Sequence, residues 1–184
     1  SILIGGAMAF TFLKIQGKNV GSSLIDEDNL NIAEEILRLA NNTNTNIVLP
    51  LDAVAGPKLS DDATWRVASL DELKNNEAGY DIGPETTMEF EMILSNAKTI
   101  IWNGPLGVSE IPAFSTGTQA IASAIIDQTE DDAISIIGGG DTASALKQYG
   151  LDKGFTHIST GGGASLQLMS GKQLPALEAL KEYA

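Results

Sequence analysis

The feature that most constrains the fold is a series of short apolar runs that stop at turns containing glycine. The runs are rich in β-branched residues and do not alternate with polar residues, which is typical of parallel strands covered on both faces. We predict such strands at Ile2–Ile4, Ile47–Leu51, Thr99–Trp102, Ile134–Ile137 and Phe155–Ile158, with a further edge strand at Trp65–Ala68.

Segments with helical periodicity lie between these strands. Asn29–Ala40 places Ala33, Ile36 and Ala40 on one helix face. Pro84 is predicted in the first turn of another helix, where its missing N–H costs nothing. Further helices are predicted at Ala113–Asp127, Thr142–Tyr149, Ala164–Met169 and Ala176–Tyr183, whereas Ala55–Asp62 and Leu73–Gly83 are predicted to be loop-rich.

The alternation of strands and helices predicts an α/β fold, as a three-layer α/β/α sandwich with a Rossmann-like, mainly parallel sheet. The 184 residues suffice for one domain with a real core, so residues 1–184 are predicted to form a single domain. The chain begins at Ser1 and enters a strand at once, from which we expect it to be part of a longer protein.

The composition argues against several classes of partner. The net charge is −13, with 24 acidic against 11 basic residues, and such a surface repels nucleic acid as a bulk partner. No apolar run approaches the roughly 20 residues that span a bilayer, so no membrane partner is expected. Cysteine is absent, which excludes thiolate metal sites and favours a reducing compartment. One small polyanion could still bind in a local pocket lined by backbone amides.

Four turns follow predicted strands and would meet at one edge of a parallel sheet, where ligands bind in such folds. They are Gly5-Gly6, Asn103-Gly104-Pro105, Gly138-Gly139-Gly140 and the run from Ser159 to Gly163. Glycine lets the backbone approach a ligand closely, and the amides of the next helix can hold phosphate oxygens. A single such turn is more often a tight connection, but four on one edge indicate a binding site.

Asp141 follows the triple glycine and has two candidate roles. A generic Gly-Asp-Thr favours capping of the next helix. The functional alternative is to hold Mg²⁺, which would resolve the repulsion between a carboxylate and bound phosphates. Thr142 could cap the helix, or donate to phosphate through its amide and hydroxyl.

A dinucleotide site is the main alternative from the residues alone. The run Gly138–Ala143 fits the G-x-G-x-x-A pattern after a strand. That pattern also needs an acidic residue at the end of the next strand, to hold ribose hydroxyls. The next predicted strand leads into Ser159-Thr160-Gly161, so the acid is missing there.

Five stretches of the chain together resemble one family. They are "GGAMAFTFLK", "DIGPET", "IIWNGPLGVSE", "IIGGGDTAS" and "HISTGGGASLQLMSGKQLPALEAL". In order and spacing they are similar to the carboxy-terminal, nucleotide-binding domain of the phosphoglycerate kinase family. The resemblance covers nearly the whole chain.

The resemblance implies reversible phosphoryl transfer from 1,3-bisphosphoglycerate to ADP, giving 3-phosphoglycerate and ATP, with Mg²⁺, in a cytoplasmic and monomeric glycolytic enzyme. It implies that phosphoglycerate is held by an amino-terminal domain not included in these residues. Closure of the two domains would exclude water, which suits catalysis by positioning and charge neutralisation.

The resemblance also assigns roles to individual residues. Base and ribose contacts are implied for Gly5, Gly6, Gly79, Tyr80, Pro105, Val108 and Glu110, with Glu110 as the acid that binds ribose hydroxyls. Phosphate contacts are implied for Asn103, Gly139, Gly140, Asp141 and Thr142, with Asp141 also facing the metal. The catalytic helix N-terminus, which faces the transferring phosphoryl group, is implied at Ser159, Thr160, Gly161, Gly162 and Gly163.

Some features depart from the family pattern. The family's Gly-Gly-Ala-Lys stretch, whose lysine is implied by the resemblance to contact the nucleotide phosphates, is not among residues 1–184. Tyr80 stands where an aliphatic wall of the adenine slot is common, and Ser109 replaces a frequent aromatic residue. We therefore expect residues 1–184 alone to bind nucleotide weakly and to lack kinase turnover. The remaining alternatives are an NAD-binding dehydrogenase domain and a non-catalytic binding module.

Overall fold

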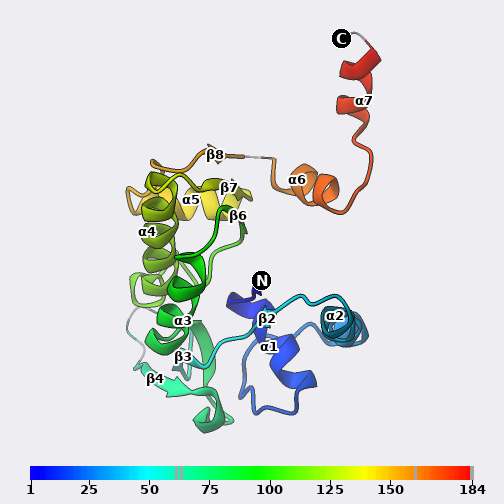
Figure 1. The fold of residues 1–184 in the computed structure, drawn as a ribbon. Coiled ribbons are helices and arrows are strands. Elements are labelled where there is room, and N and C mark those ends of the chain that lie inside the picture. The colour runs from blue at the N-terminus through cyan, green and yellow to red at the C-terminus, as the bar shows by residue number, and fades with distance from the viewer. Residues whose placement is uncertain (61, 63, 160, 183–184) are drawn as a thin grey trace. The chain divides into compact units, whose positions relative to one another are not determined.

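The computed structural model describes residues 1–60, 62, 64–159 and 161–182. The chain divides into two compact units, one comprising Ser1–Asn96 with Pro105–Ala124, the other Ala97–Gly104 with Ile125–Ala184. The boundary therefore crosses the chain after Asn96, after Gly104 and again inside helix α4 (Thr116–Glu130). Figure 1 follows the chain through these elements.

The first unit carries two small sheets. Its elements are β1 (Ile2–Leu3), α1 (Gly6–Ile15), the 3₁₀ turn η1 (Glu27–Asn29), α2 (Leu30–Asn42), β2 (Ile47–Val48), β3 (Asp52–Gly56), β4 (Arg66–Ser69), the 3₁₀ turn η2 (Leu70–Glu72), β5 (Ala78–Ile82), α3 (Pro84–Leu94), the 3₁₀ turn η3 (Pro112–Phe114) and the first part of α4. Strands β1 and β2 pair in parallel. Strands β4, β3 and β5 form an antiparallel sheet with β3 at its centre.

Helix α1 joins two clusters of buried side chains in this unit. Phe10 and Leu13 pack with Ala53 and Ala55 of β3. Ala9 and Phe12, also on α1, pack with Ala33 of α2. The small residues of β3 are thus matched to the aromatic and aliphatic side chains that α1 places against the sheet.

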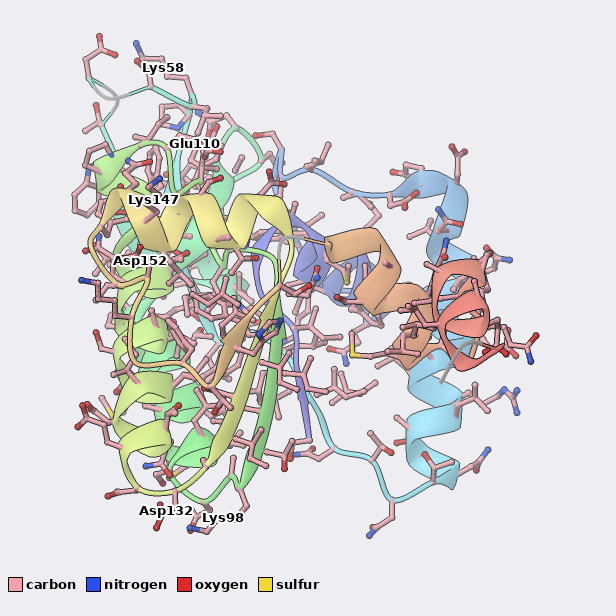
Figure 2. The ribbon with its side chains drawn as sticks, turned by 90° about the horizontal axis from the view of Figure 1, so that it is seen from above. Lys58, Lys98, Glu110, Asp132, Lys147 and Asp152 are labelled. Carbon is pink, nitrogen blue, oxygen red and sulfur yellow. The ribbon has the colours of Figure 1, made fainter. Side chains whose placement is uncertain are left out.

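The second unit is built on a parallel sheet. It contains β6 (Thr99–Asn103), the end of α4, β7 (Ile134–Gly138), α5 (Gly140–Gln148), β8 (His157–Ile158), α6 (Gly162–Met169) and α7 (Pro175–Glu182). Strand β7 is central and pairs in parallel with β6 and β8. Lys98 and Asp132 lie together at the amino-terminal end of β6 and β7 (Figure 2), the end opposite to the glycine turns.

The predicted α/β class with mostly parallel strand pairing is confirmed, and the predicted strands and helices are found with shifted ends. Two predictions were wrong: β3 and β5 occupy parts of the segments predicted to be loop-rich. Their sequences, Asp-Ala-Val-Ala-Gly and Ala-Gly-Tyr-Asp-Ile, have few typical strand formers, and burial under α1 compensates. Helix α1 was not predicted.

Two shorter corrections concern element lengths. The strand predicted over Phe155–Ile158 is limited to His157–Ile158, and the one predicted over Ile47–Leu51 is limited to Ile47–Val48. Among the described residues, no helix is both long and apolar enough to cross a bilayer. The prediction of a single domain over residues 1–184 stays a prediction.

Candidate functional site

The carboxyl ends of β6 and β7 lie level with each other in the second unit. Asn103, the last residue of β6, pairs with Gly138, the last residue of β7. A Cβ atom at Gly138 would lie 2.9 Å from Nδ2 of Asn103. Glycine at this position therefore leaves room for the Asn103 side chain at the edge of the sheet.

Helix α5 begins directly after this edge. Its N-cap is Gly139, at a φ of 94° that favours glycine, and no side-chain hydrogen bond caps the helix within the described residues. The first amides of a helix have no partner inside the helix. Gly140 and Asp141 lie in this first turn, and Asp141 is exposed. The amides at the start of α5 can therefore bind an anion.

Helix α6 begins next to the same turn. A Cβ atom at Gly162 would lie 2.8 Å from Cα and 3.2 Å from N of Gly139. The N–H of Gly161 donates to Oγ of Ser159 at 3.3 Å, and Oγ of Ser159 lies 3.1 Å from Oγ of Ser165. Two helix N-termini thus start side by side, each at a glycine turn. Thr160 lies outside the described residues.

Thr142 has a role inside the protein. Its side chain is fully buried, and Oγ1 accepts the N–H of Gly104 at 2.7 Å. This bond ties the turn after β6 to the first turn of α5. The Thr142 hydroxyl therefore fixes the backbone beside Asn103, and the Thr142 amide remains among the first-turn amides of α5.

Asp141 is the residue best placed to hold a cation in this unit. It is exposed in the first turn of α5, and the alternative prediction that it caps the helix was wrong, because Gly139 is the N-cap. Over the described parts of the chain, no group of three or more His, Cys, Asp or Glu residues could form a metal cage. Mg²⁺ is commonly bound by one or two carboxylates together with substrate phosphates. A single carboxylate, Asp141, beside a turn that can bind phosphate fits this mode of Mg²⁺ binding.

The loop from Pro105 to Glu110 is held tightly in the first unit. The N–H groups of Leu106 and Gly107 donate to Oγ1 of Thr118 at 3.0 and 3.2 Å. The N–H of Val108 donates to the carbonyl of Tyr80 on β5 at 2.8 Å. The loop is thus tied both to β5 and to the first turns of α4, and Glu110 stands exposed at its end (Figure 2).

The glycines at the start of α1 approach this loop. A Cβ atom at Gly5 would lie 2.5 Å from Cδ2 of Leu106. Gly6 has a φ of 62°, and its Cβ would lie 3.1 Å from the carbonyl oxygen of Pro105. Close packing between these two segments requires both glycines.

Gly79 and Tyr80 on β5 have different neighbours. A Cβ atom at Gly79 would lie 2.2 Å from the ring of Phe10, so packing against α1 explains this glycine. The Tyr80 ring is half-buried and lies against Phe114, with ring centroids 4.9 Å apart and an interplanar angle of 46°. Burial raises the pKa of the Tyr80 phenol. The aromatic pair of Tyr80 and Phe114 therefore lies at β5, the strand whose Tyr80 carbonyl binds the loop backbone.

Sequence reasoning missed Asp81, which is buried beside the loop. Its Oδ2 accepts the N–H of Gly117 at 2.8 Å, and its Oδ1 accepts the N–H of Ile82 at 2.9 Å. Burial raises the pKa of the Asp81 carboxyl to about 7, although both hydrogen bonds act in the opposite direction. The signal available in the sequence was the Asp-Ile-Gly-Pro run, but it fell in a segment predicted to be loop-rich.

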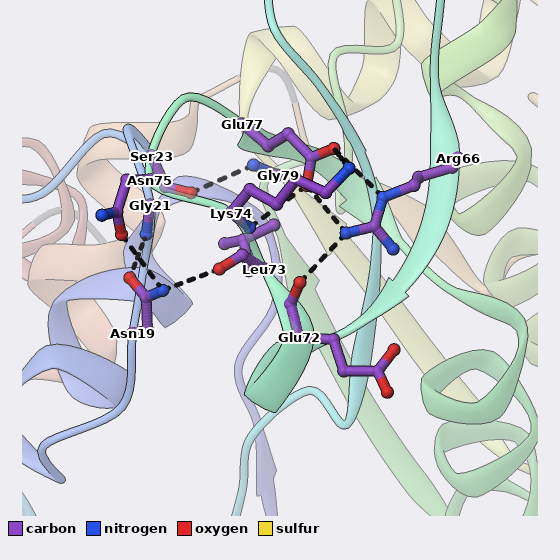
Figure 3. A network of polar contacts seen from close by, with 10 residues as sticks. All are labelled: Asn19, Gly21, Ser23, Arg66, Glu72, Leu73, Lys74, Asn75, Glu77 and Gly79. Atoms are coloured by element: carbon purple, nitrogen blue, oxygen red, sulfur yellow. Dashed lines mark hydrogen bonds and ion pairs between the residues drawn. The ribbon is translucent and has the colours of Figure 1, made fainter.

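A polar network supports β5 from its other end (Figure 3). Arg66 binds Glu77 through Nε and Nη2, at 3.0 and 2.8 Å, and these bonds lower the pKa of the Glu77 carboxyl to about 2. Ser23 accepts the N–H of Gly79 at 3.0 Å, and the N–H of Ser22 donates to the Glu77 carbonyl at 2.9 Å. The network fastens the chain after α1 to the strand that carries Gly79 and Tyr80.

The structure therefore brings the predicted residues together in two groups. One group, in the first unit, is Gly5, Gly6, Pro105 and Val108 with Tyr80. The other, in the second unit, is Asn103, Gly139, Gly140, Asp141 and Thr142 with Gly161, Gly162 and Gly163.

Comparisons with known proteins identify the family. The sequence model of the phosphoglycerate kinase family matches residues 1–172. The phosphoglycerate kinase of Prosthecochloris aestuarii is 50% identical over 182 residues, which cover 99% of this chain and 46% of the relative. That of Chloroherpeton thalassium is 47% identical over 180 residues, which cover 98% of this chain and 45% of the relative.

Solved structures agree with the sequence relatives. The structure of phosphoglycerate kinase from Coxiella burnetii matches 99% of this chain and 46% of its own, with a TM-score of 0.93 and 41% identity. The chain therefore belongs to the phosphoglycerate kinase family. It spans about half the length of the relatives that it matches.

Proposed function

We propose that this chain is the part of a phosphoglycerate kinase that binds MgADP and MgATP. The observation that carries the proposal is the close approach of Gly162 to Gly139, which starts α5 and α6 side by side at the end of a parallel sheet. Amides at helix N-termini favour phosphate oxygens. Membership of the phosphoglycerate kinase family over residues 1–172 supports the same assignment.

The phosphates are assigned to residues of the second unit. The amides of Gly139, Gly140 and Thr142 would bind phosphate oxygens, and the Asn103 amide would contact them near the ribose. Asp141 would hold Mg²⁺, which when bound neutralises phosphate charge. Gly161, Gly162 and Gly163 would place the amides of α6 towards the phosphoryl group that is transferred.

The base and ribose are assigned to residues of the first unit. Gly5, Gly6 and Gly79 would line the adenine slot, with Tyr80, Pro105 and Val108 as apolar walls. The exposed Glu110 would accept hydrogen bonds from ribose hydroxyls. The loop backbone supports these assignments, because its amides are bound to Thr118 and Tyr80, which restrains the loop.

The proposed reaction transfers a phosphoryl group from the acyl phosphate of 1,3-bisphosphoglycerate to ADP. In the reverse direction the carboxyl group of 3-phosphoglycerate is the acceptor. A β-phosphate oxygen of ADP forms the new P–O bond, and the carboxylate of 3-phosphoglycerate leaves. Neither group needs a proton removed at neutral pH, so these residues would act by positioning and charge stabilisation. We infer a cytoplasmic, monomeric enzyme in which phosphoglycerate is bound outside residues 1–184, and no turnover by these residues alone.

Calorimetric titration of this chain with ADP, with and without Mg²⁺, tests the proposal. We expect binding that Mg²⁺ strengthens, and we expect the Asp141→Asn variant to lose that strengthening. NAD serves as the control for a dehydrogenase domain, because preference for NAD over ADP would contradict the proposal. A folded chain that binds neither compound would contradict the proposal that residues 1–184 form the nucleotide site by themselves. A coupled assay of the same sample should detect no ATP formation.

A further inference from the structure

Asp81 is a buried carboxylate to which the proposed function gives no role. It is 4% exposed and lies on β5, next to Tyr80. Its two hydrogen bonds go to the backbone, one within β5 and one to Gly117 in the first turn of α4. It therefore connects the strand to the start of a helix through a single carboxylate.

Two glycines from different segments lie close to this carboxylate. A Cβ atom at Gly107 would lie 2.3 Å from Oδ1 of Asp81, and one at Gly117 would lie 2.6 Å from the same atom. Side chains at these positions would collide with the carboxylate. The loop backbone at Gly107 and the helix backbone at Gly117 thus both approach Asp81 too closely for any residue but glycine.

The same loop segment is attached to the same helix by a second contact. The N–H groups of Leu106 and Gly107 donate to Oγ1 of Thr118, the residue after Gly117. Movement of the first turn of α4 would therefore displace the loop that carries Pro105, Val108 and Glu110. The Thr118 hydroxyl thus binds the loop, and the Asp81 carboxylate binds the first turn of the same helix.

The surroundings of Asp81 contain little that could compensate its charge. On the neighbouring strand β3, the titratable residue is Asp52, whose carboxylate accepts the N–H groups of Glu85 and Thr86 in α3. The loop carries the exposed Glu110, and β5 carries Tyr80, whose ring lies against Phe114. Within the described residues, η3 and the part of α4 in the first unit contain no charged side chain. Two backbone N–H groups are what stabilises the ionised form.

We propose that the ionised Asp81 carboxylate is a positioning residue, which holds the Pro105–Glu110 loop and the first turn of α4 in the conformation that binds the base and ribose. This inference rests on the proposed function. Protonation would remove the negative charge that attracts both N–H groups and would place a donor against one of them. In a loosened state in which Asp81 stays buried but loses these N–H groups, its pKa would be higher still, so protonation favours that loosened state. Affinity for base and ribose is then lower when Asp81 is neutral, and it rises with pH through the pKa of about 7.

Adenosine is the probe for this effect, because ADP phosphates titrate with a pKa of about 6 and would obscure it. We expect the affinity of the chain for adenosine to rise about fivefold between about pH 5.5 and pH 8.5, at the low end of typical coupling energies. The Asp81→Asn variant keeps the shape, loses the charge, and should bind adenosine weakly and with no such pH dependence. An affinity of the unchanged chain that is flat across this range would overturn the proposal.

Asp52→Asn is the matched control. It makes the same substitution at another buried aspartate at a helix N-terminus, whose bonds go to α3 rather than to the loop or α4. It should reduce stability and keep the pH dependence of adenosine affinity. Loss of that dependence in the control would show a general destabilisation and would contradict the specific role of Asp81.

A second readout separates failure of this inference from failure of the proposed function. The amide resonances of Gly107 and Gly117 should titrate with one shared midpoint in the unchanged chain, and this titration should vanish in Asp81→Asn. Gly117 shifting without Gly107 would overturn the coupling of the carboxylate to the loop. If both amides titrate together but neither adenosine nor MgADP binds at any pH, the proposed function fails while the positioning of the loop stands.

Discussion

The two groups of candidate residues are built by different physical means. In the second unit, the structure relies on backbone: glycine turns at Gly139 and Gly162, and the first-turn amides of α5 and α6. In the first unit, it relies on buried side chains: the Thr118 hydroxyl binds the loop from Pro105 to Glu110, and the Asp81 carboxylate binds the first turn of α4.

The difference suits the parts of a nucleotide that each group is proposed to hold. Phosphates are small, charged and alike in all nucleotides, so amides at helix N-termini suffice. A base and a ribose have defined shapes, and a slot for them needs a loop held in one conformation. Changes to glycines in the second unit should therefore affect phosphate binding, and changes to buried polar groups in the first unit should affect adenosine binding.

The largest effect on ligand affinity is expected for Gly162→Val. Any Cβ at this position would lie 2.8 Å from Cα of Gly139, so α5 and α6 would have to separate. We expect a loss of MgADP affinity of about 100-fold, which is about 2.7 kcal/mol, and no change for adenosine, both measured by calorimetry.

Gly150→Ala is the control for this prediction. Gly150 follows α5 at a φ of 69°, and a Cβ atom there would meet no other atom within 4 Å, so alanine strains the backbone without touching a candidate residue. It should cost about 1–2 kcal/mol of stability and leave MgADP affinity intact. Equal losses of affinity in both variants would contradict the proposed use of Gly162.

The second effect concerns stability and pH. Because burial raises the pKa of Asp81 to about 7 from 3.8, the folded chain keeps a proton that the unfolded chain has released between these values. Rising pH must therefore lower the free energy of unfolding over this window. We expect the free energy of unfolding, relative to Asp81→Asn, to fall by up to about 3 kcal/mol between about pH 5 and pH 8 in urea titrations. A difference that is constant or rises with pH would contradict the burial of this carboxyl.

The third effect is expected for Thr118→Val. The substitution keeps the shape of a fully buried residue and removes the acceptor for the N–H groups of Leu106 and Gly107. It should cost about 1–3 kcal/mol of stability and weaken adenosine binding. Thr86→Val removes a comparable buried hydroxyl that accepts the N–H groups of Leu51 and Asp52, so it should cost stability alone. Equal adenosine affinities of Thr118→Val and Thr86→Val would contradict the role of Thr118 in holding the loop.

The smallest effect is expected for Glu77→Gln, which tests the support of β5. The hydrogen bonds from Arg66 lower the pKa of Glu77 to about 2 from 4.5, so their stabilisation is present above pH 4.5 and is lost as the pH falls towards 2. The stability difference between the two proteins should therefore shrink over this window and be mostly lost at pH 2. Acid unfolding followed by circular dichroism measures it, and a difference that does not shrink between pH 4.5 and pH 2 would contradict the assigned pairing.

Sequence reasoning succeeded where the backbone alone sets the requirement. A turn that places Gly139 at a φ of 94° needs glycine, so the glycine in the sequence indicates the turn. Sequence reasoning failed where tertiary contacts determine the role of a residue. Asp81 and Thr118 are ordinary polar residues in the sequence, and their partners lie 36 and 12 residues away along the chain. Strand β3 was missed for the same reason, because its alanines fit a strand only beneath Phe10 and Leu13.

The measurement that tests the account most directly is mapping of backbone amide resonances on this chain with three ligands. MgADP should shift the amides of Gly140 and Gly162 together with those of Val108 and Glu110. Adenosine should shift only the latter pair, and magnesium pyrophosphate only the former. If adenosine shifts the glycine turns, or MgADP leaves either pair unmoved, the assignment of phosphates to one group and of base and ribose to the other is wrong.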